Sequence, residues 1–168
     1  MNGKPWVAIA VVVVALGGLG FTVFRPAYFP NVTVASDADP VTIDQVRGER
    51  PTLVLALLAP GDPMSKAALT KMSADYEKYE PRASFAGLVF GTPAQAAAWQ
   101  KEQQLPFPVY ALAPQENPVD YNQIVKTLGG FRNRFYIGTV VVLTSSRRIS
   151  QQVNGNELEN LSDTLKKL

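Results

Sequence analysis

The sequence predicts an α/β fold, with a mixed central sheet flanked by helices and a single N-terminal transmembrane helix in front of it. Three observations lead to this prediction. Residues 5–24 contain no charged side chain. From Val41 onward, apolar runs of strand length alternate with segments whose apolar residues recur every three or four positions, as in a sheet covered by helices. The 168 residues are enough for one such domain.

The uncharged N-terminal segment has the length of a membrane span. Residues 5–24 would form about 30 Å of helix, which matches the hydrocarbon layer of a bilayer. Trp6 and Phe24 lie at its two ends, where aromatic anchors belong. With Lys4 in the cytoplasm, the remainder of the chain would be exported. We therefore expect a single-pass protein of the bacterial inner membrane whose C-terminal domain lies in the periplasm.

The same segment allows a second interpretation. Gly18 and Gly20 form a small-x-small site after an apolar core, which is typical of a cleaved secretory signal. We favour the anchor, because apolar residues continue past that site to Phe24. Gly17, Gly18 and Gly20 would also let another helix approach closely, although the segment has no strict small-xxx-small pair.

Four regions follow from these patterns: a cytoplasmic N-terminus (residues 1–4), the membrane helix (5–24), a linker (25–40) and the folded domain (41–168). The linker is predicted to be extended because it contains three prolines and few periodic apolar positions. The domain begins with the segment Val41–Leu55, and the first long apolar run of the domain starts within this segment, at Thr52.

The first half of the domain shows clear start signals. Thr52–Ala59 is a continuous apolar run, as expected of a strand buried on both faces. Asp62 followed by Pro63 predicts a helix start. The apolar side of that helix would carry Leu69, Met72, Tyr76 and Tyr79, and its wet side Lys71 and Asp75. The tyrosines are interpreted as packing residues rather than as an acid-base group.

The second half continues the alternation. A strand is predicted over Ser84–Phe90, and a capping box at Thr92 opens the next helix. The remaining predicted elements are a strand over Phe107–Leu112, a helix from Asn117-Pro118 that ends at Gly129-Gly130, a hairpin of Tyr136–Leu143 with Ile149–Val153, and a last helix that starts at Asn156 and carries Leu158, Leu161, Leu165 and Leu168 on one stripe.

Two residue types are missing from the sequence, and their absence excludes several kinds of chemistry. The chain has no Cys and no His. It therefore cannot form disulfides, thiolate nucleophiles, Cys or His metal sites, or triads that use His as the base. Asp37, Asp39 and Asp44 are not followed by a calcium-binding loop, so we expect no metal and no cofactor. A net charge of +2 without aromatic interleaving also gives no reason to expect nucleic acid.

A family resemblance is carried by three stretches. Val41–Leu55 resembles the opening of the redoxin branch of the thioredoxin-like superfamily, which contains peroxiredoxins and membrane-tethered thiol-disulfide oxidoreductases. Leu105–Val109 is similar to that family's "lpfpv" stretch. Where the family places its active-site Cys-Pro-x-Cys, this chain reads Asp62-Pro63-Met64-Ser65. The third stretch, Gly138–Leu143, matches the strand that in the family begins with a cis-proline beside the active site, and this chain has Gly138 in the place of that proline. The resemblance covers residues 41–155.

The resemblance implies a thioredoxin-like fold without thioredoxin-like chemistry. Thiol-disulfide exchange and peroxide reduction both need a thiolate at the helix N-terminus. An aspartate at position 62 can cap and stabilise the same helix end, but it cannot cycle between redox states.

Basic residues gather toward the C-terminus. Residues 37–125 contain 7 basic and 11 acidic side chains, whereas residues 126–168 contain 7 basic and 3 acidic ones. Arg132, Arg134, Arg147 and Arg148 would form one patch if the hairpin lies beside the preceding loop. We interpret the patch as a solvated edge that discourages strand pairing. The alternative is a docking surface for an acidic partner or lipid headgroups.

These observations favour a non-catalytic accessory subunit that is held at the lipid bilayer and braces or assembles a membrane complex with other subunits. A photosynthetic or respiratory complex would be a natural host. A second hypothesis is a peptide- or ligand-binding module, or a chaperone, that uses the former active-site groove near Pro60–Met64 and Gly138. An enzyme that uses Asp62 with a nearby Lys or Tyr is the least favoured hypothesis.

Overall fold

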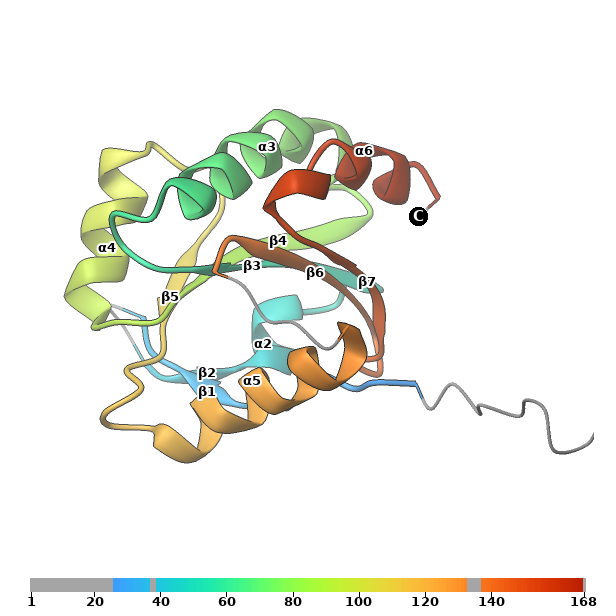
Figure 1. The fold of residues 1–168 in the computed structure, drawn as a ribbon. Helices are drawn as coiled ribbons and strands as arrows, with labels where there is room; N and C mark the ends of the chain where they lie inside the picture. Colours follow the sequence, from blue (N-terminus) through green and yellow to red (C-terminus); the bar gives the residue numbers. More distant parts are fainter. Residues whose placement is uncertain (1–25, 37–38, 133–136, 168) are drawn as a thin grey trace, which may run out of the picture.

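The computed structural model describes residues 26–36, 39–132 and 137–167. They form a five-stranded mixed sheet in the order β5-β4-β3-β6-β7 (Figure 1). The parallel strands are β3 (Thr52–Leu58), β4 (Ala83–Val89) and β5 (Val109–Ala111). The antiparallel strands are β6 (Thr139–Thr144) and β7 (Ile149–Val153). The mixed central sheet and its C-terminal hairpin are therefore confirmed.

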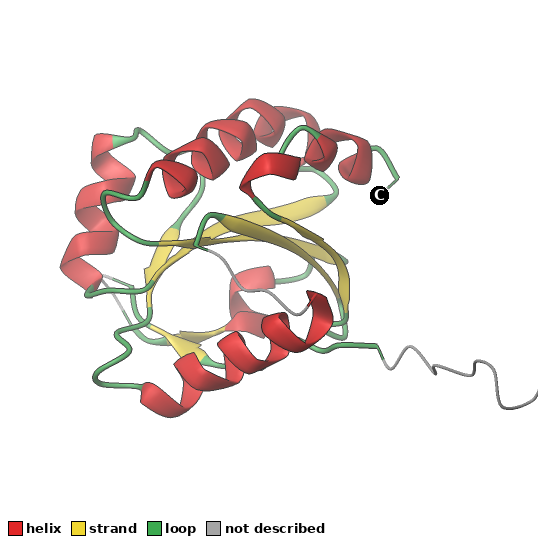
Figure 2. Cartoon of the chain, in the orientation of Figure 1, coloured by secondary structure: helices red, strands yellow, loops and turns green. Residues whose placement is uncertain are grey.

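Helices cover both faces of this sheet (Figure 2). One face carries α3 (Pro63–Tyr79), α4 (Pro93–Glu102), the 3-10 turn η1 (Gly155–Glu157) and α6 (Asn160–Leu165). The other face carries α2 (Ile43–Arg47) and α5 (Pro118–Arg132), with a small sheet of β1 (Thr33–Val34) and β2 (Val41–Thr42).

The central strand β3 shows why two helical layers are needed. Val54, Ala56 and Leu58 belong to one apolar cluster, and Leu53, Leu55 and Leu57 belong to the other. Successive strand residues point to opposite faces, so an uninterrupted apolar run has to be covered on both sides. The prediction of a doubly buried strand is confirmed.

The region predicted as a linker differs from the prediction. In its described part, β1 pairs with β2, and Ala35 bridges Ala111 at the edge of the main sheet. Phe29, Val32 and Val34 are buried in the apolar cluster on the face of the sheet that carries α2 and α5. Burial of these three apolar side chains fixes the segment against the domain, and the prolines around them had concealed the pattern.

Two helix ends also differ from the prediction. α5 continues through Gly129-Gly130 to Arg132 instead of ending there. A glycine pair lowers helix stability but does not terminate a helix that buries Ile124 and Leu128. The C-terminal region begins as a 3-10 turn at Gly155, and the α-helix starts only at Asn160. Leu158, between the two, and Leu161, in the helix, are both buried.

The predicted membrane segment, with Trp6, Gly17, Gly18, Gly20 and Phe24, lies outside the described residues. No helix within the described ranges is both long enough and apolar enough to span a bilayer.

Candidate functional site: the former redox motif

The four residues that replace the redox motif lie at the N-terminus of α3, immediately after the carboxyl end of β3. Asp62 is the N-cap residue, and its Oδ2 accepts a hydrogen bond from the Ser65 amide at 2.7 Å. Pro63 occupies the first helical turn, where a missing N–H costs nothing. The predicted helix start is therefore confirmed in detail, and the carboxylate is used as a cap.

Ser65 has a second structural role. Its side chain is fully buried, and its Oγ accepts a hydrogen bond from the Ala59 amide at 3.0 Å. This bond ties the loop after β3 to the first turn of α3. Both positions that would carry thiols in a redoxin thus hold oxygen atoms that satisfy backbone amides.

Gly138 lies directly against Met64. Its φ is +80°, and its N–H donates to the Leu57 carbonyl at 2.7 Å. A Cβ at this position would lie 2.6 Å from the backbone carbonyl carbon of Met64. Both the positive φ and the close approach therefore require glycine at residue 138.

The Met64 side chain continues from this contact toward Gly155. A Cβ built on Gly155 would lie 1.4 Å from Cε of Met64, so the methionine methyl group occupies the space where a side chain would stand. Glycines at positions 138 and 155 thus accommodate the backbone and the side chain of Met64, respectively. Beside the hypothesised groove at Pro60–Met64 and Gly138, the missing side chain of Gly138 leaves no open space, because Met64 takes it up.

Gly155 was missed by the sequence reasoning. It precedes the last helix, where glycine is ordinary, and no spacing connects it to residue 64. Only the antiparallel return through β6 and β7 brings η1 back to the start of α3.

Comparisons with known proteins agree with this fold. No family model matches the chain, and no curated protein matches it. Among solved structures, a thiol:disulfide interchange protein from Bacteroides sp. aligns with a TM-score of 0.64 at 9% identity, over 83% of this chain and 88% of that one. A thioredoxin family thiol:disulfide interchange protein from Chlorobium tepidum TLS gives 0.58 at 15% identity, over 84% and 97%. Peroxidoxin BcpB from Mycobacterium tuberculosis gives 0.60 at 13% identity, over 84% and 94%. The chain has a thioredoxin-like fold.

Of the predicted basic patch, the structure describes the side chains of Arg147 and Arg148. The side chain of Arg147 is turned inward: it pairs with Asp44, and its Nε donates to the Phe29 carbonyl at 3.3 Å. Arg148 is exposed beside Tyr28, which it bridges at the edge of the sheet. Arg134 and the side chain of Arg132 lie outside the described residues. Arg147 therefore fastens the N-terminal segment to the hairpin.

A polar cluster between α3 and α6 was also not predicted. Asp75, expected on the wet side of its helix, is only 8% exposed. Its carboxylate accepts from Ser162 Oγ at 2.9 and 3.0 Å, and it lies 3.4 Å from Lys71 Nζ. Lys71 Nζ also donates to Ser162. The sequence shows the i,i+4 spacing of Lys71 and Asp75, but it gives no sign that Ser162 on α6 is their partner.

The two tyrosines of α3 pack in different surroundings, Tyr79 beside this polar cluster and Tyr76 against an aromatic ring. Tyr79 is buried, and its hydroxyl group donates to the Ser162 carbonyl at 3.5 Å. The Tyr76 ring lies 5.5 Å from the Phe85 ring in an edge-to-face arrangement. Both tyrosines therefore pack, as predicted. The amine of Lys71 is engaged by two oxygen atoms, so it is held as a structural ion pair.

Proposed function

We propose that this protein is a non-catalytic accessory subunit whose thioredoxin-like domain, anchored to the bacterial inner membrane by residues 5–24 and facing the periplasm, braces or assembles a membrane protein complex. One observation carries the proposal. At the two motif positions, Asp62 caps α3 and Ser65 accepts the Ala59 amide, in a chain without cysteine. The oxygen atoms that replace the thiols stabilise the fold and have no redox chemistry.

The contacts of Met64 argue against the alternative, a groove that binds a peptide or ligand. The methionine packs against the backbone of both Gly138 and Gly155, so the described chain itself fills the space beside the motif. A ligand at this end would have to displace Met64. A rigid, internally satisfied domain is better suited to hold neighbouring subunits than to enclose a small molecule.

A redox assay on the full chain in detergent tests the loss of chemistry. We expect no reduction of insulin disulfides and no peroxide consumption above a buffer control, with a thioredoxin and a peroxiredoxin as positive controls. Turnover by the chain would overturn the non-catalytic part of the proposal.

Copurification tests the role as a subunit. We expect the tagged full chain, extracted from native membranes in mild detergent, to retain partner proteins at stoichiometric yield. Crosslinking read by mass spectrometry would then identify the docking face, because the exposed lysines lie on different elements: Lys66 at the start of α3, Lys126 on α5, and Lys166 and Lys167 after α6. Lys71 is expected to react poorly, because its amine is paired with Asp75. A chain that migrates alone would count against the proposal.

A further inference from the structure

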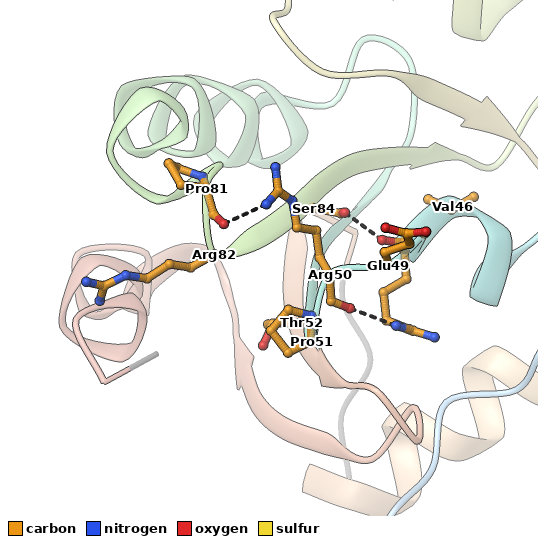
Figure 3. Close-up of a pocket in the computed structure, with 10 residues that line it drawn as sticks. Val46, Glu49, Arg50, Pro51, Thr52, Pro81, Arg82 and Ser84 are labelled. Atoms are coloured by element: carbon orange, nitrogen blue, oxygen red, sulfur yellow. Dashed lines mark hydrogen bonds between the residues drawn. The ribbon is translucent and has the colours of Figure 1, made fainter.

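A polar cleft lies at the end of the sheet opposite to the former redox motif (Figure 3). It has a volume of about 1000 Å³ and opens between the turn from α2 to β3 and the turn from α3 to β4, where these two parallel strands begin. Three arginines, Arg47, Arg50 and Arg82, line it together with one acidic residue, Glu49. We call it the arginine cleft. Three positive charges and one negative charge give its lining a net charge of +2.

Hydrogen bonds between the two turns hold the walls of the arginine cleft in place. Ser84 Oγ donates to the Arg47 carbonyl at 2.7 Å, and Arg47 Nη1 donates to the Arg50 carbonyl at 2.7 Å (Figure 3). Arg50 Nη1 reaches across to the Pro81 carbonyl, also at 2.7 Å. Gly48, at φ +61°, closes the end of α2 and directs the chain into the cleft wall. The guanidinium groups of Arg47 and Arg50 are therefore held in place by backbone carbonyls before a ligand binds.

These internal bonds use only part of the donor capacity of the arginines. A guanidinium group has five N–H donors. Nε of Arg47 is buried and has no hydrogen-bond partner among the described residues. Arg50 Nη2 lies 3.9 Å from Glu80, and both side chains are about half exposed, which makes a weak ion pair. The exposed Arg82 side chain has no hydrogen bond or ion pair with another described residue.

From this arrangement we infer that the arginine cleft binds a phosphate group, with Arg50 and Arg82 as its direct contacts and Arg47 as the residue that positions Arg50. A dianionic phosphate matches the net charge of the lining and offers oxygen atoms to several guanidinium donors at once. A role of Arg50 in bracing the end of α3 explains its bond to Pro81. It leaves unexplained the exposed Arg82 side chain, which points away from Arg50 (Figure 3), has no partner among the described residues and is free to turn toward a ligand. This inference does not depend on the accessory role proposed above.

A titration of the ¹⁵N-labelled full chain in neutral detergent tests the inference. With inorganic phosphate as the probe at constant ionic strength, we expect saturable shifts of the Gly48 and Arg50 amide signals. Arg82→Gln should weaken this binding about tenfold, the loss expected for a charge-assisted hydrogen bond. Arg148→Gln is the matched control: it removes an exposed arginine outside the cleft and should change the dissociation constant less than twofold.

A second arm distinguishes a soluble phosphate compound from a phosphate headgroup of a lipid. The full chain is placed in nanodiscs of phosphatidylcholine alone or with phosphatidic acid, and the same amide signals are compared. Shifts with inorganic phosphate alone support a soluble ligand, and shifts that also appear with phosphatidic acid support a headgroup. The inference is overturned if neither probe shifts these signals, or if Arg82→Gln and Arg148→Gln weaken binding equally.

Discussion

The two ends of the central sheet have opposite characters. At the carboxyl ends of the parallel strands, Asp62 and Ser65 satisfy backbone amides, and Met64 packs against two glycines. At the amino ends, three arginines line an open cleft, and some of their N–H groups, such as Nε of Arg47, have no hydrogen-bond partner among the described residues. In open α/β sheets, ligands usually bind outside the carboxyl ends of the strands. In this chain the carboxyl ends are closed by the chain's own residues. The N–H donors of the arginine cleft that remain without a hydrogen-bond partner in the described chain lie at the amino ends.

We therefore expect residues at one end of the sheet to determine folding stability and residues at the other end to determine ligand binding. Substitutions at the closed end should cost folding free energy, because each group there is buried or paired. Substitution of Arg82 in the arginine cleft should change ligand binding and leave folding almost intact, because its exposed side chain has no partner among the described residues. Four predictions test this separation, and each can be read from urea unfolding of the full chain in detergent, followed by circular dichroism.

The largest effect is expected for Gly138→Ala. The methyl group would meet the Met64 backbone at 2.6 Å, at a φ of +80° that residues other than glycine rarely adopt. Left-handed strain and overpacking each cost about 1–3 kcal/mol, so we expect a loss of about 2–5 kcal/mol in the free energy of unfolding. Gly129→Ala is the control: it lies within α5 with no neighbour within 4 Å, and it should stabilise the fold by about 0.5–1 kcal/mol. A Gly138→Ala loss below about 1 kcal/mol would contradict a tightly closed end.

Ser65→Ala should have the next largest effect. It removes the hydrogen bond that the Ala59 amide donates to Ser65 Oγ at 3.0 Å, and it does so at a buried side chain. An unsatisfied buried amide costs about 1–3 kcal/mol. Thr70→Ala on the exposed side of α3 removes a hydroxyl that bonds only to the Lys66 carbonyl of its own helix, and it should cost far less. Equal losses in the two variants would show that Ser65 has no special role.

Asp62→Ala is expected to cost about 1 kcal/mol, the usual value for loss of an N-cap. Asp62→Asn should retain most of the stability, because an amide oxygen can also accept the Ser65 N–H. If both variants lose the same free energy, the negative charge at the helix N-terminus, rather than the hydrogen bond, is what stabilises this end.

The sequence was sufficient to predict most of the closed end. Asp62 followed by Pro63 is a strong local signal, since the cap and the first turn involve residues only three positions apart. The doubly buried strand was predictable for the same reason: seven successive buried residues, Thr52–Leu58, leave no polar face. Contacts between distant segments were not predictable. Met64 meets Gly155 only because β6 and β7 return the chain to the start of α3.

The arginine cleft was missed for a similar reason. Arg47 and Arg50 lie on one turn and Arg82 on another, and the pairing of Thr52 with Ala83 brings the two turns together. In the sequence these arginines are scattered within a region that is acidic overall, so they gave no signal. Of the four arginines near the C-terminus that were predicted as one patch, Arg147 is paired with Asp44 and donates to the Phe29 carbonyl, and neither partner was predictable from the sequence.

The smallest effects on the free energy of unfolding are expected for Arg82→Gln alone and for its coupling energy with Gly138→Ala. Arg82→Gln alone should change the free energy of unfolding by less than about 0.5 kcal/mol, because its exposed side chain has no partner among the described residues. Seven residues of β3 separate the two ends by about 20 Å, at about 3.3 Å per residue. Sites so far apart usually add within about 0.5 kcal/mol, so Gly138→Ala combined with Arg82→Gln should lose the sum of the single losses. A larger coupling energy would mean that closure at one end affects the arginine cleft at the other, and phosphate titration of Gly138→Ala would then show altered affinity as well.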